Sequence, residues 1–412
     1  MAAKQYFTRQ VVLLQSANIA SSVGNGIVMV TIPWLVLNNT GLASAAGIVA
    51  ALSALPALFV TPLVGYAVDR FGRRQLSIIT DLASAISVVA FPVLALFTDL
   101  TFSLILALAV LGAVIDPAGY TARKSIIPDV AAAAKINRDE LNGVYEGLFA
   151  LGFTLGPLIG ALSIAAFGTL NSFWIPAVLF VVAALCILAL RIRDAGQDAR
   201  AAKAALPEQS SHSFWHEATQ GFTVLWRDPY LRTITIAMIF LAGVYLPTEG
   251  LVLPVYFEST DNAMGLGIVI SAMAGGGVVG AFLYGTLRRR FSYKTIARMV
   301  LIGTAAALIP MSLLPPLPIL AGFGFLLGLA WGPMNPLINS LVQTRVPADL
   351  QGRVFAIELS LFYSFPPIAM LVTGFAIDGI GVKAVYPILT ALVVVGSVLT
   401  LGTRALRTLD QA

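Results

Sequence analysis

The stretch that decides the fold is GYAVDRFGRRQ, Gly65 to Gln75, because it gathers one acid and three arginines between two long apolar runs. Charge is rare elsewhere in the chain. Asp, Glu, Lys and Arg make up 11% of the 412 residues, whereas they make up roughly 25% of soluble domains. Apolar residues account for 58% of the sequence, and a soluble protein of this length has no interior large enough to hold them. The sequence therefore predicts a polytopic membrane protein.

Apolar segments of about 20 residues, the length that crosses a bilayer as a helix, recur along the whole chain. They are expected near residues 11–37, 44–68, 75–97, 101–122, 141–168, 172–192, 231–257, 264–287, 294–314, 317–342, 353–377 and 382–403. The predicted fold class is an all-α polytopic membrane protein with twelve transmembrane helices in two pseudo-symmetric six-helix halves. GYAVDRFGRRQ is then the loop between the second and third spans.

The Lys and Arg residues fix the orientation of these spans, because short loops rich in positive charge stay in the cytoplasm. If the N-terminus is cytoplasmic, all of the 25 basic residues except Lys383 fall on the cytoplasmic side. We therefore expect a multi-pass protein of the cell (inner) membrane with both termini in the cytoplasm. The net charge of +5 is spread over many short loops in this way, which argues against a nucleic-acid partner.

The two halves resemble each other. GIV at Gly47 recurs at Gly267, 220 residues later, and Asp116-Pro117 in span four aligns with Asn335-Pro336 in span ten at an offset of 219. Matches that keep their order and a near-constant offset indicate parallel repeats, an architecture found in transporters.

The predicted domains are an N-terminal six-helix bundle, 1–192, and a C-terminal six-helix bundle, 230–412. Between them, residues 193–229 form a polar, Ala-rich cytoplasmic linker. Its last part is predicted to be an amphipathic helix on the membrane surface, with Phe214, Ala218, Phe222, Leu225 and Trp226 on one face.

The residues that carry most enzymatic and metal chemistry are scarce. Cys186 is the sole cysteine, and the two histidines, His212 and His216, lie in the polar linker. One chain cannot build a disulfide or a cysteine metal site from these. The nucleotide-binding pattern GxxxxGK[ST] is absent from the sequence, which excludes ATP drive within this chain. We expect no enzymatic activity, no cofactor and no metal, and we rank a membrane-embedded enzyme or a sensor well below a transporter.

Twelve spans in two halves, with this charged loop after the second, resemble the major facilitator superfamily. The signature of the superfamily in that loop is G-x-x-x-D-R-x-G-R-[RK]. The residues that match its fixed positions are Gly65, Asp69, Arg70, Gly72, Arg73 and Arg74.

The fifth span is similar to a second signature of the superfamily, G-x8-G-x3-G-P-x2-G, which is typical of its proton-coupled antiporter branches. The matching residues are Gly143, Gly152, Gly156, Pro157 and Gly160, and Ala161 follows where a further glycine is usual. PWLVLNNTG, TARKSIIPD, LPVYF and QGRVFAI look like the branch that holds macrolide-efflux, enterobactin-export and multidrug proteins. The span-four arginine of the drug-antiporter pattern is missing at mid-membrane depth, and Asp116 occupies the deeper part of that span.

The resemblance implies that the charged loop is a cytoplasmic latch that forms in one state of the transporter and breaks in the other. Asp69 would face the N-terminus of span eleven, near Arg353, where exposed N–H groups favour an anion. The arginines would pair with acids of neighbouring loops such as Asp129. The alternative is a plain cluster of positive charge that anchors the loop. The glycines of span five and GGG at 275–277 are expected to permit close packing between the halves.

Acids inside the spans are candidates for proton or substrate binding, because a charge at membrane depth costs at least ~2.5 kcal/mol. These acids are Asp116, Glu146, Glu249 and Glu358. The resemblance places Asp116 and Glu249 on cavity-lining spans, where protonation from outside would drive export. A helix cap beside Pro117 and a water-exposed vestibule are the alternatives for these two. Glu146 and Glu358 lie near the cytoplasmic ends of their spans, where an interdomain contact is as good an interpretation as proton transfer. Asp81 is expected to be interfacial.

Amides and aromatic residues in the same spans are candidates for cargo contacts. The amides are Asn18, Asn25, Asn335 and Asn339, and hydrogen bonds between helices are the equal alternative for them. Tyr245 and Trp331 are assigned a cargo role against the alternative of anchoring at the membrane interface.

The sequence thus predicts a secondary active transporter that exports lipophilic or cationic small molecules by proton antiport with alternating access. The alternative is an exporter of a specific metabolite, siderophore or lipid. Its partners are expected to be the cargo, protons and the lipid bilayer, and the chain is expected to work as a monomer.

Overall fold

A computed structural model describes residues 8–54, 72–192 and 222–408, and every secondary-structure element in these ranges is helical. Within these ranges, eleven helices are long and apolar enough to cross a membrane. The second predicted span is described over its first part, an apolar helix at Ala43–Ala54. Many large apolar side chains are exposed, among them Phe97 (81%) and Phe282 (75%), as expected where lipid replaces water as the solvent. The prediction of an all-α polytopic membrane protein is confirmed.

The chain folds into two compact units. The first unit comprises Met1–Gly41, Leu52–Gln209 and Asp261–Gly267, and the second comprises Leu42–Ala51, Ser210–Thr260 and Ile268–Ala412. The units follow the two halves of the sequence except for two short segments, the beginning of span two and the beginning of span eight. The domain bounds drawn from the sequence, at 192 and 230, stay a prediction, and most of the linker lies outside the described residues.

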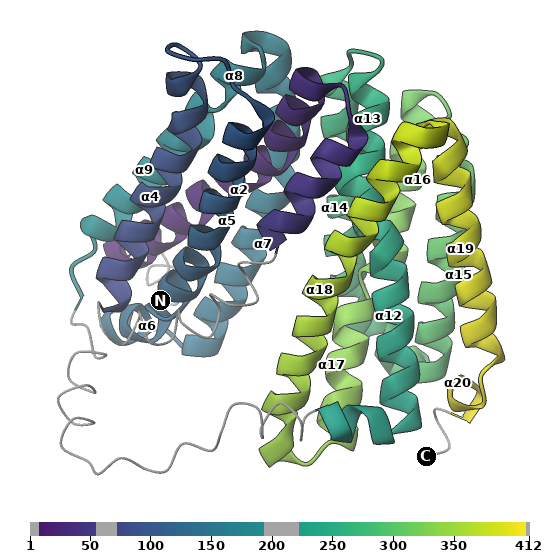
Figure 1. Ribbon diagram of the computed structural model, residues 1–412. Coiled ribbons are helices and arrows are strands. Elements are labelled where there is room, and N and C mark those ends of the chain that lie inside the picture. The colour runs from purple at the N-terminus through teal and green to yellow at the C-terminus, as the bar shows by residue number, and fades with distance from the viewer. Residues whose placement is uncertain (1–7, 55–71, 193–221, 409–412) are drawn as a thin grey trace. The chain divides into compact units, whose positions relative to one another are not determined.

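The first unit is a bundle of long helices in which α2 packs against α7 and α9, and α4 packs against α5 and α9 (Figure 1). Its helices are α2 (Arg9–Thr40), α4 (Arg73–Leu94), α5 (Phe102–Lys124), α6 (Ile127–Ala134), α7 (Arg138–Phe167), α8 (Thr169–Ser172) and α9 (Trp174–Leu188). Gly41 ends α2 because its φ of 66° is a left-handed conformation that glycine adopts without strain.

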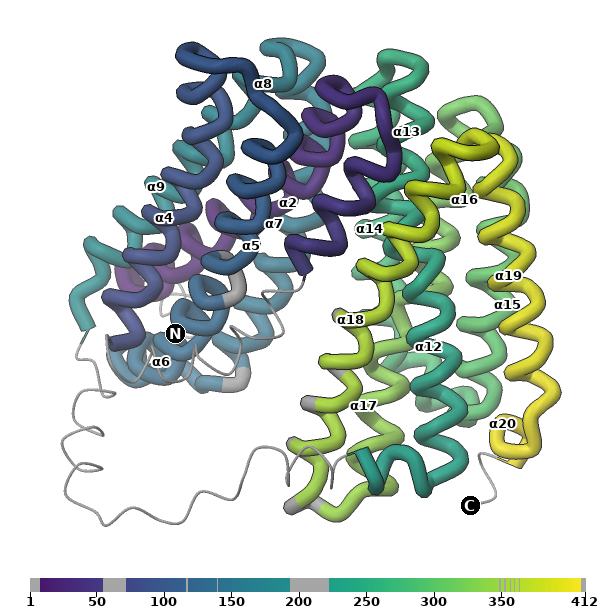
Figure 2. Tube along the Cα trace, viewed as in Figure 1, coloured from purple at the N-terminus to yellow at the C-terminus, as the bar shows by residue number. Residues whose placement is uncertain are grey.

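In the second unit, α12 packs against α18 and α19, and α15 packs against α16 and α19 (Figure 2). The helices are α12 (Pro229–Pro247), η1 (Thr248–Val252), α13 (Leu253–Glu258), α14 (Ala263–Arg290), α15 (Tyr293–Ser312), α16 (Leu317–Trp331), α17 (Met334–Arg345), α18 (Ala348–Ile380), α19 (Val382–Gly402) and α20 (Arg404–Thr408). The Asp228 carboxylate caps α12 by accepting hydrogen bonds from the N–H groups of Tyr230 and Leu231.

Two breaks in regular α-helix position polar side chains in the second unit. Span ten is divided at Gly332-Pro333, where α16 ends and α17 begins. Span seven contains the π-helical turn η1, just before Pro254. Proline has no N–H group and its ring crowds the carbonyl one turn earlier, so the turn before Pro254 does not keep ordinary α geometry. A π turn inside an α-helix often marks a functional position.

Candidate functional site

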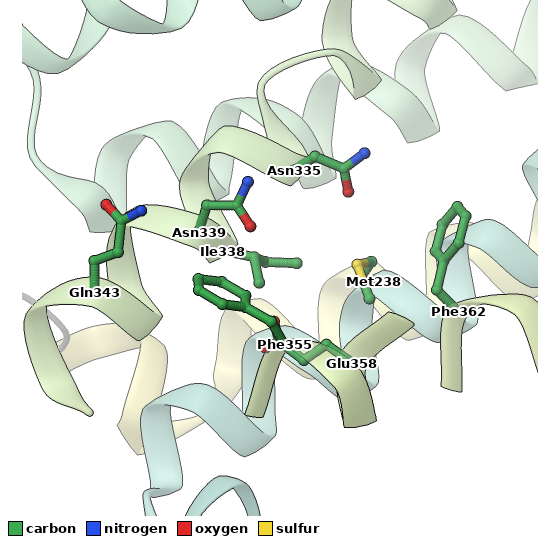
Figure 3. Close-up of a pocket in the computed structure, with 8 residues that line it drawn as sticks. All are labelled: Met238, Asn335, Ile338, Asn339, Gln343, Phe355, Glu358 and Phe362. Carbon is green, nitrogen blue, oxygen red and sulfur yellow. The ribbon is translucent and has the colours of Figure 1, made fainter. Parts of the chain in front are cut away.

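The second unit contains a pocket of about 530 Å³ that combines one acid with amides and apolar side chains (Figure 3). It is lined by Met238, Asn335, Ile338, Asn339, Gln343, Phe355, Glu358 and Phe362. Three of these, Asn335, Asn339 and Glu358, are candidates from the sequence, and the structure brings them together.

One wall of the pocket is a row of amides on α17. Asn335, Asn339 and Gln343 lie four residues apart, which places them on one face of the helix. Asn335 lies in the first turn of α17, directly after the interruption at Gly332-Pro333. This row can donate and accept hydrogen bonds along one side of a bound molecule.

The facing side chains come from α18 and α12. Phe355, Glu358 and Phe362 of α18 recur at spacings of three and four, so they share a face of that helix. Glu358 is only 5% exposed. Its Oε1 atom accepts a hydrogen bond of 3.1 Å from the hydroxyl group of the buried residue Thr235 on α12.

Glu358 has no basic partner among the residues that the structure describes. The residues lining the pocket also contain no Lys, Arg or His. A proton or a positively charged molecule in the pocket would balance the charge of Glu358. The rings of Phe355 and Phe362, which line the same pocket, suit a lipophilic cation, because aromatic faces attract cations.

Glu249 lies in the π turn of span seven, apart from the residues that line the pocket. It is 7% exposed, so it is buried within the second unit. Across the described parts of the chain its carboxylate forms no ion pair. Tyr245, one turn earlier on α12, stacks on Trp331 with 5.2 Å between the ring centroids. The two aromatic residues predicted to contact cargo therefore contact each other.

The remaining acids of the sequence prediction lie in the first unit. Glu146 accepts hydrogen bonds from the Tyr120 hydroxyl at 3.0 and 3.2 Å. It also forms an ion pair with Lys124 at 2.5 Å, and both of these side chains are nearly half exposed. Asp116 belongs to α5, but its side chain lies outside the described residues.

Two of the amides predicted for span one lie along α2. Asn25 is half-buried. Asn18 is fully buried and donates a hydrogen bond of 2.8 Å to the backbone carbonyl of Tyr145 on α7. Asn18 therefore joins two helices of the first unit.

The charged loop of the superfamily signature is described from Gly72 onward. Gly72 precedes α4 directly and has a φ of 90°, a backbone angle that glycine adopts without strain. Arg73 pairs with Asp129 at 3.5 Å, and Arg74 donates to the carbonyl oxygens of Ile187 and Leu188. The other signature residues, Gly65, Asp69 and Arg70, lie outside the described residues.

The glycines of the fifth span differ in their surroundings. A methyl group on Gly156 would lie 2.6 Å from Cα of Gly26, and one on Gly160 would lie 3.2 Å from Cα of Ile27. Gly152 faces Ser22, whereas Gly143 has no atom within 4 Å of where a methyl group would stand. The contacts of Gly156 and Gly160 join α7 to α2 inside the first unit, whereas packing between the halves was predicted. At Gly26 and Gly156 the backbones of α2 and α7 meet directly, which leaves no room for a side chain on either residue. Span five meets the second half of the sequence at Pro157 and Ala161 instead, which lie against Gly267 of α14.

The GGG stretch of α14 also packs within its own unit. A methyl group on Gly276 would meet the backbone of α16 at Phe325 and Leu329. This close approach holds α14 against α16 in the second unit, whereas a contact between the halves was predicted for this stretch.

A buried ion pair in the first unit was not predicted from the sequence. Arg123 of α5 donates a hydrogen bond of 2.6 Å to Asp81 of α4, and these side chains are 2% and 3% exposed. Asp81 was expected at the interface with water. The available signal was an acid and a base at the matching ends of two neighbouring spans. The sequence also gave no reason to single out Thr235, Phe355 and Phe362, because such residues are common in apolar helices.

Acids and amides buried between apolar helices mark functional positions in membrane proteins, and they are typical of the pathways of transporters. Residues 16–365 match the model of the Major Facilitator Superfamily, and the chain belongs to this family. It is 36% identical to the "Multidrug efflux pump Tap" of Mycolicibacterium fortuitum, over 97% of each chain. It is 35% identical to the protein of the same name from Mycobacterium tuberculosis, over 97% of this chain and 94% of that one. The crystal structure of the nucleoside transporter NupG has the same fold, with a TM-score of 0.75 at 14% identity over 95% of this chain and 98% of that one.

Proposed function

We propose that this chain exports lipophilic or cationic drugs by proton antiport with alternating access, and that the pocket around Glu358 binds the cargo. The observation that carries the proposal is Glu358 itself, a buried carboxylate in a pocket with no basic partner among the described residues. One group then binds either a proton or a cation, and the two cannot be present together without excess positive charge. This competition couples the entry of a proton to the release of the cargo.

The relatives support the choice of cargo. Curated proteins that match almost the whole chain are named multidrug efflux pumps, and amides with aromatic rings suit molecules of varied shape. The alternative cargo, a specific metabolite, siderophore or lipid, is less well supported, since an anionic member of these classes needs a base and the pocket lining has none.

The proposed setting is the cell membrane, with both termini in the cytoplasm and the chain working as a monomer in contact with lipid. The distribution of Lys and Arg supports this orientation. Asp116 and Glu249 remain candidates for a proton site that is separate from the cargo pocket.

The test is uptake of ethidium, a lipophilic cation, into proteoliposomes with an imposed pH gradient. The variants are Glu358→Gln, Glu249→Gln and Asp116→Asn, with Glu258→Gln at the end of α13 as the control outside the pocket. We expect Glu358→Gln to abolish accumulation driven by the pH gradient, because the amide cannot take up a proton. Accumulation at the parental rate in this variant would refute the assignment, and loss in Asp116→Asn or Glu249→Gln alone would move the proton site there. No accumulation by the parent protein would refute proton antiport of this cation.

A further inference from the structure

Span two begins without a capping side chain of its own. Its helix starts at Ala43, directly after Leu42, and leucine has no polar group with which to satisfy the first N–H groups of a helix. Asp378 supplies the missing acceptor from span eleven. Its two carboxylate oxygens accept hydrogen bonds from the backbone N–H groups of Ala43, at 2.8 Å, and Ser44, at 3.0 Å.

Asp378 stands at the unfavourable end of its own helix. It lies in the last turn of α18, where the exposed carbonyl groups repel an anion. At the start of the helix Ala43–Ala54 the exposed N–H groups attract it. Among the described residues Asp378 forms no ion pair, so these two N–H groups are its charge-stabilising partners. The negative charge is therefore stabilised by the contact between the two helices.

The same two helices touch through glycines over the next two turns. A methyl group on Gly374 would lie 2.8 Å from the carbonyl oxygen of Ala43, and one on Gly47 would lie 2.8 Å from the carbonyl oxygen of Met370. Residues 370, 374 and 378 recur at a spacing of four, so they form one stripe along α18. This contact explains why Leu42–Ala51 belongs to the second unit although the rest of the first half of the chain does not.

We propose that Asp378 is a positioning residue of the transport cycle, a latch that holds the beginning of span two against the end of span eleven. The latch has to release before the protein can open on the side of the membrane where these two helix ends lie. The distribution of basic residues predicts that this end faces outside. The inference rests on the alternating access of the proposed function. It does not depend on which acid carries the proton or on the identity of the cargo.

The test uses two cysteine reporters in a Cys186→Ser background, with the full chain in lipid nanodiscs and a membrane-impermeant maleimide. The first reporter is Ser44→Cys, at a residue that is 8% exposed and lies at the contact with Asp378. The second is Gln343→Cys, at an exposed position near the other end of span ten. Each reporter is combined with Asp378→Asn, which removes the charge and one acceptor oxygen.

In the Asp378→Asn variant we expect the maleimide to label the Ser44→Cys reporter about tenfold faster, which corresponds to about 1.4 kcal/mol. The Gln343→Cys reporter should be labelled more slowly. Reciprocal change is the mark of alternating access, since a protein that opens more at one end opens less at the other. Gly374→Ala should act in the same direction, because its methyl group separates the helices while the Asp378 carboxylate is retained. Asp261→Asn, in an exposed loop, is the matched control and should change neither rate.

An unchanged labelling rate of the Ser44→Cys reporter in both Asp378→Asn and Gly374→Ala would overturn the proposal. Faster labelling of both reporters would also overturn it, since that result means local loosening. Proton antiport is judged separately, by ethidium uptake in the parent protein. If the parent shows no pH-driven uptake but the reporters move reciprocally, the latch stands and the proton coupling is wrong.

Discussion

Replacing Gly156 by alanine is expected to destabilise the first unit, whereas replacing Gly143 by alanine in the same helix is expected to leave it intact or stabilise it. A methyl group on Gly156 would lie 2.6 Å from Cα of Gly26 and 2.8 Å from the carbonyl oxygen of Val23, and ordinary contact begins at 3.4 Å. These are backbone atoms that cannot rotate away. Helices α2 and α7 must therefore separate by roughly 1 Å along their contact, and such overpacking costs about 1–3 kcal/mol.

The opposite sign at Gly143 follows from helix propensity. No atom lies within 4 Å of where its methyl group would stand. Alanine is favoured over glycine inside a helix by about 1 kcal/mol. Gly143→Ala should therefore gain stability of this order, whereas crowding outweighs the same gain in Gly156→Ala. The assay is thermal unfolding of both purified variants in one detergent, with Gly26→Ala as a second probe of the crowded contact. A Gly156→Ala protein at least as stable as the parent would show that α2 and α7 are not packed as closely as described here.

Replacing either of two adjacent basic residues on α5, Arg123 or Lys124, is expected to change the stability of the protein by very different amounts. Arg123→Gln removes the base that pairs with the buried Asp81 carboxylate and should destabilise the protein by about 3–5 kcal/mol. Lys124→Gln breaks an exposed pair with Glu146 and should cost less than about 1 kcal/mol. Thermal unfolding measures both effects, and equal effects would contradict the burial of the Asp81 pair. Phe355→Ala should weaken ethidium binding roughly fivefold, about 1 kcal/mol of cation–π contact, while pH-driven uptake persists; fluorescence titration measures the Kd, and an unchanged Kd would place the cargo outside this pocket.

The spans could be predicted from the sequence because membrane helices need long apolar segments, and that signal survives without any tertiary information. The breaks inside the spans could not be predicted in the same way. The π turn at Thr248–Val252 and the division at Gly332-Pro333 lie inside segments whose mean hydropathy stays high, so the hydropathy pattern continues across them. Prolines at 254 and 333 were the available signs, but proline also occurs inside several unbroken helices of this chain, such as α2 at Pro33.

The pocket could be predicted in part. Polar residues stand out against an apolar background, and Asn335, Asn339 and Glu358 were found for that reason. Phe355 and Phe362 were not found, because an aromatic residue in a span carries no mark of what it faces. Their role depends on α17 and α18 lying on opposite sides of one space, which is a property of the packed unit.

The partners of the acids decide which of them can carry a proton, and partners come from tertiary structure. Asp81 has Arg123 and Glu146 has Lys124, so a proton on either acid would cost an ion pair and leave a base behind. Glu358 has a single hydroxyl partner and no base in the part of the chain that the structure describes. Taking up a proton there removes an uncompensated buried charge and breaks no ion pair. Under the proposed antiport, proton exchange at Glu358 would need no rearrangement of other charged side chains. The same holds for Glu249, which is also buried and forms no ion pair among the described residues, so the two carboxylates are distinguished by the pocket that Glu358 lines.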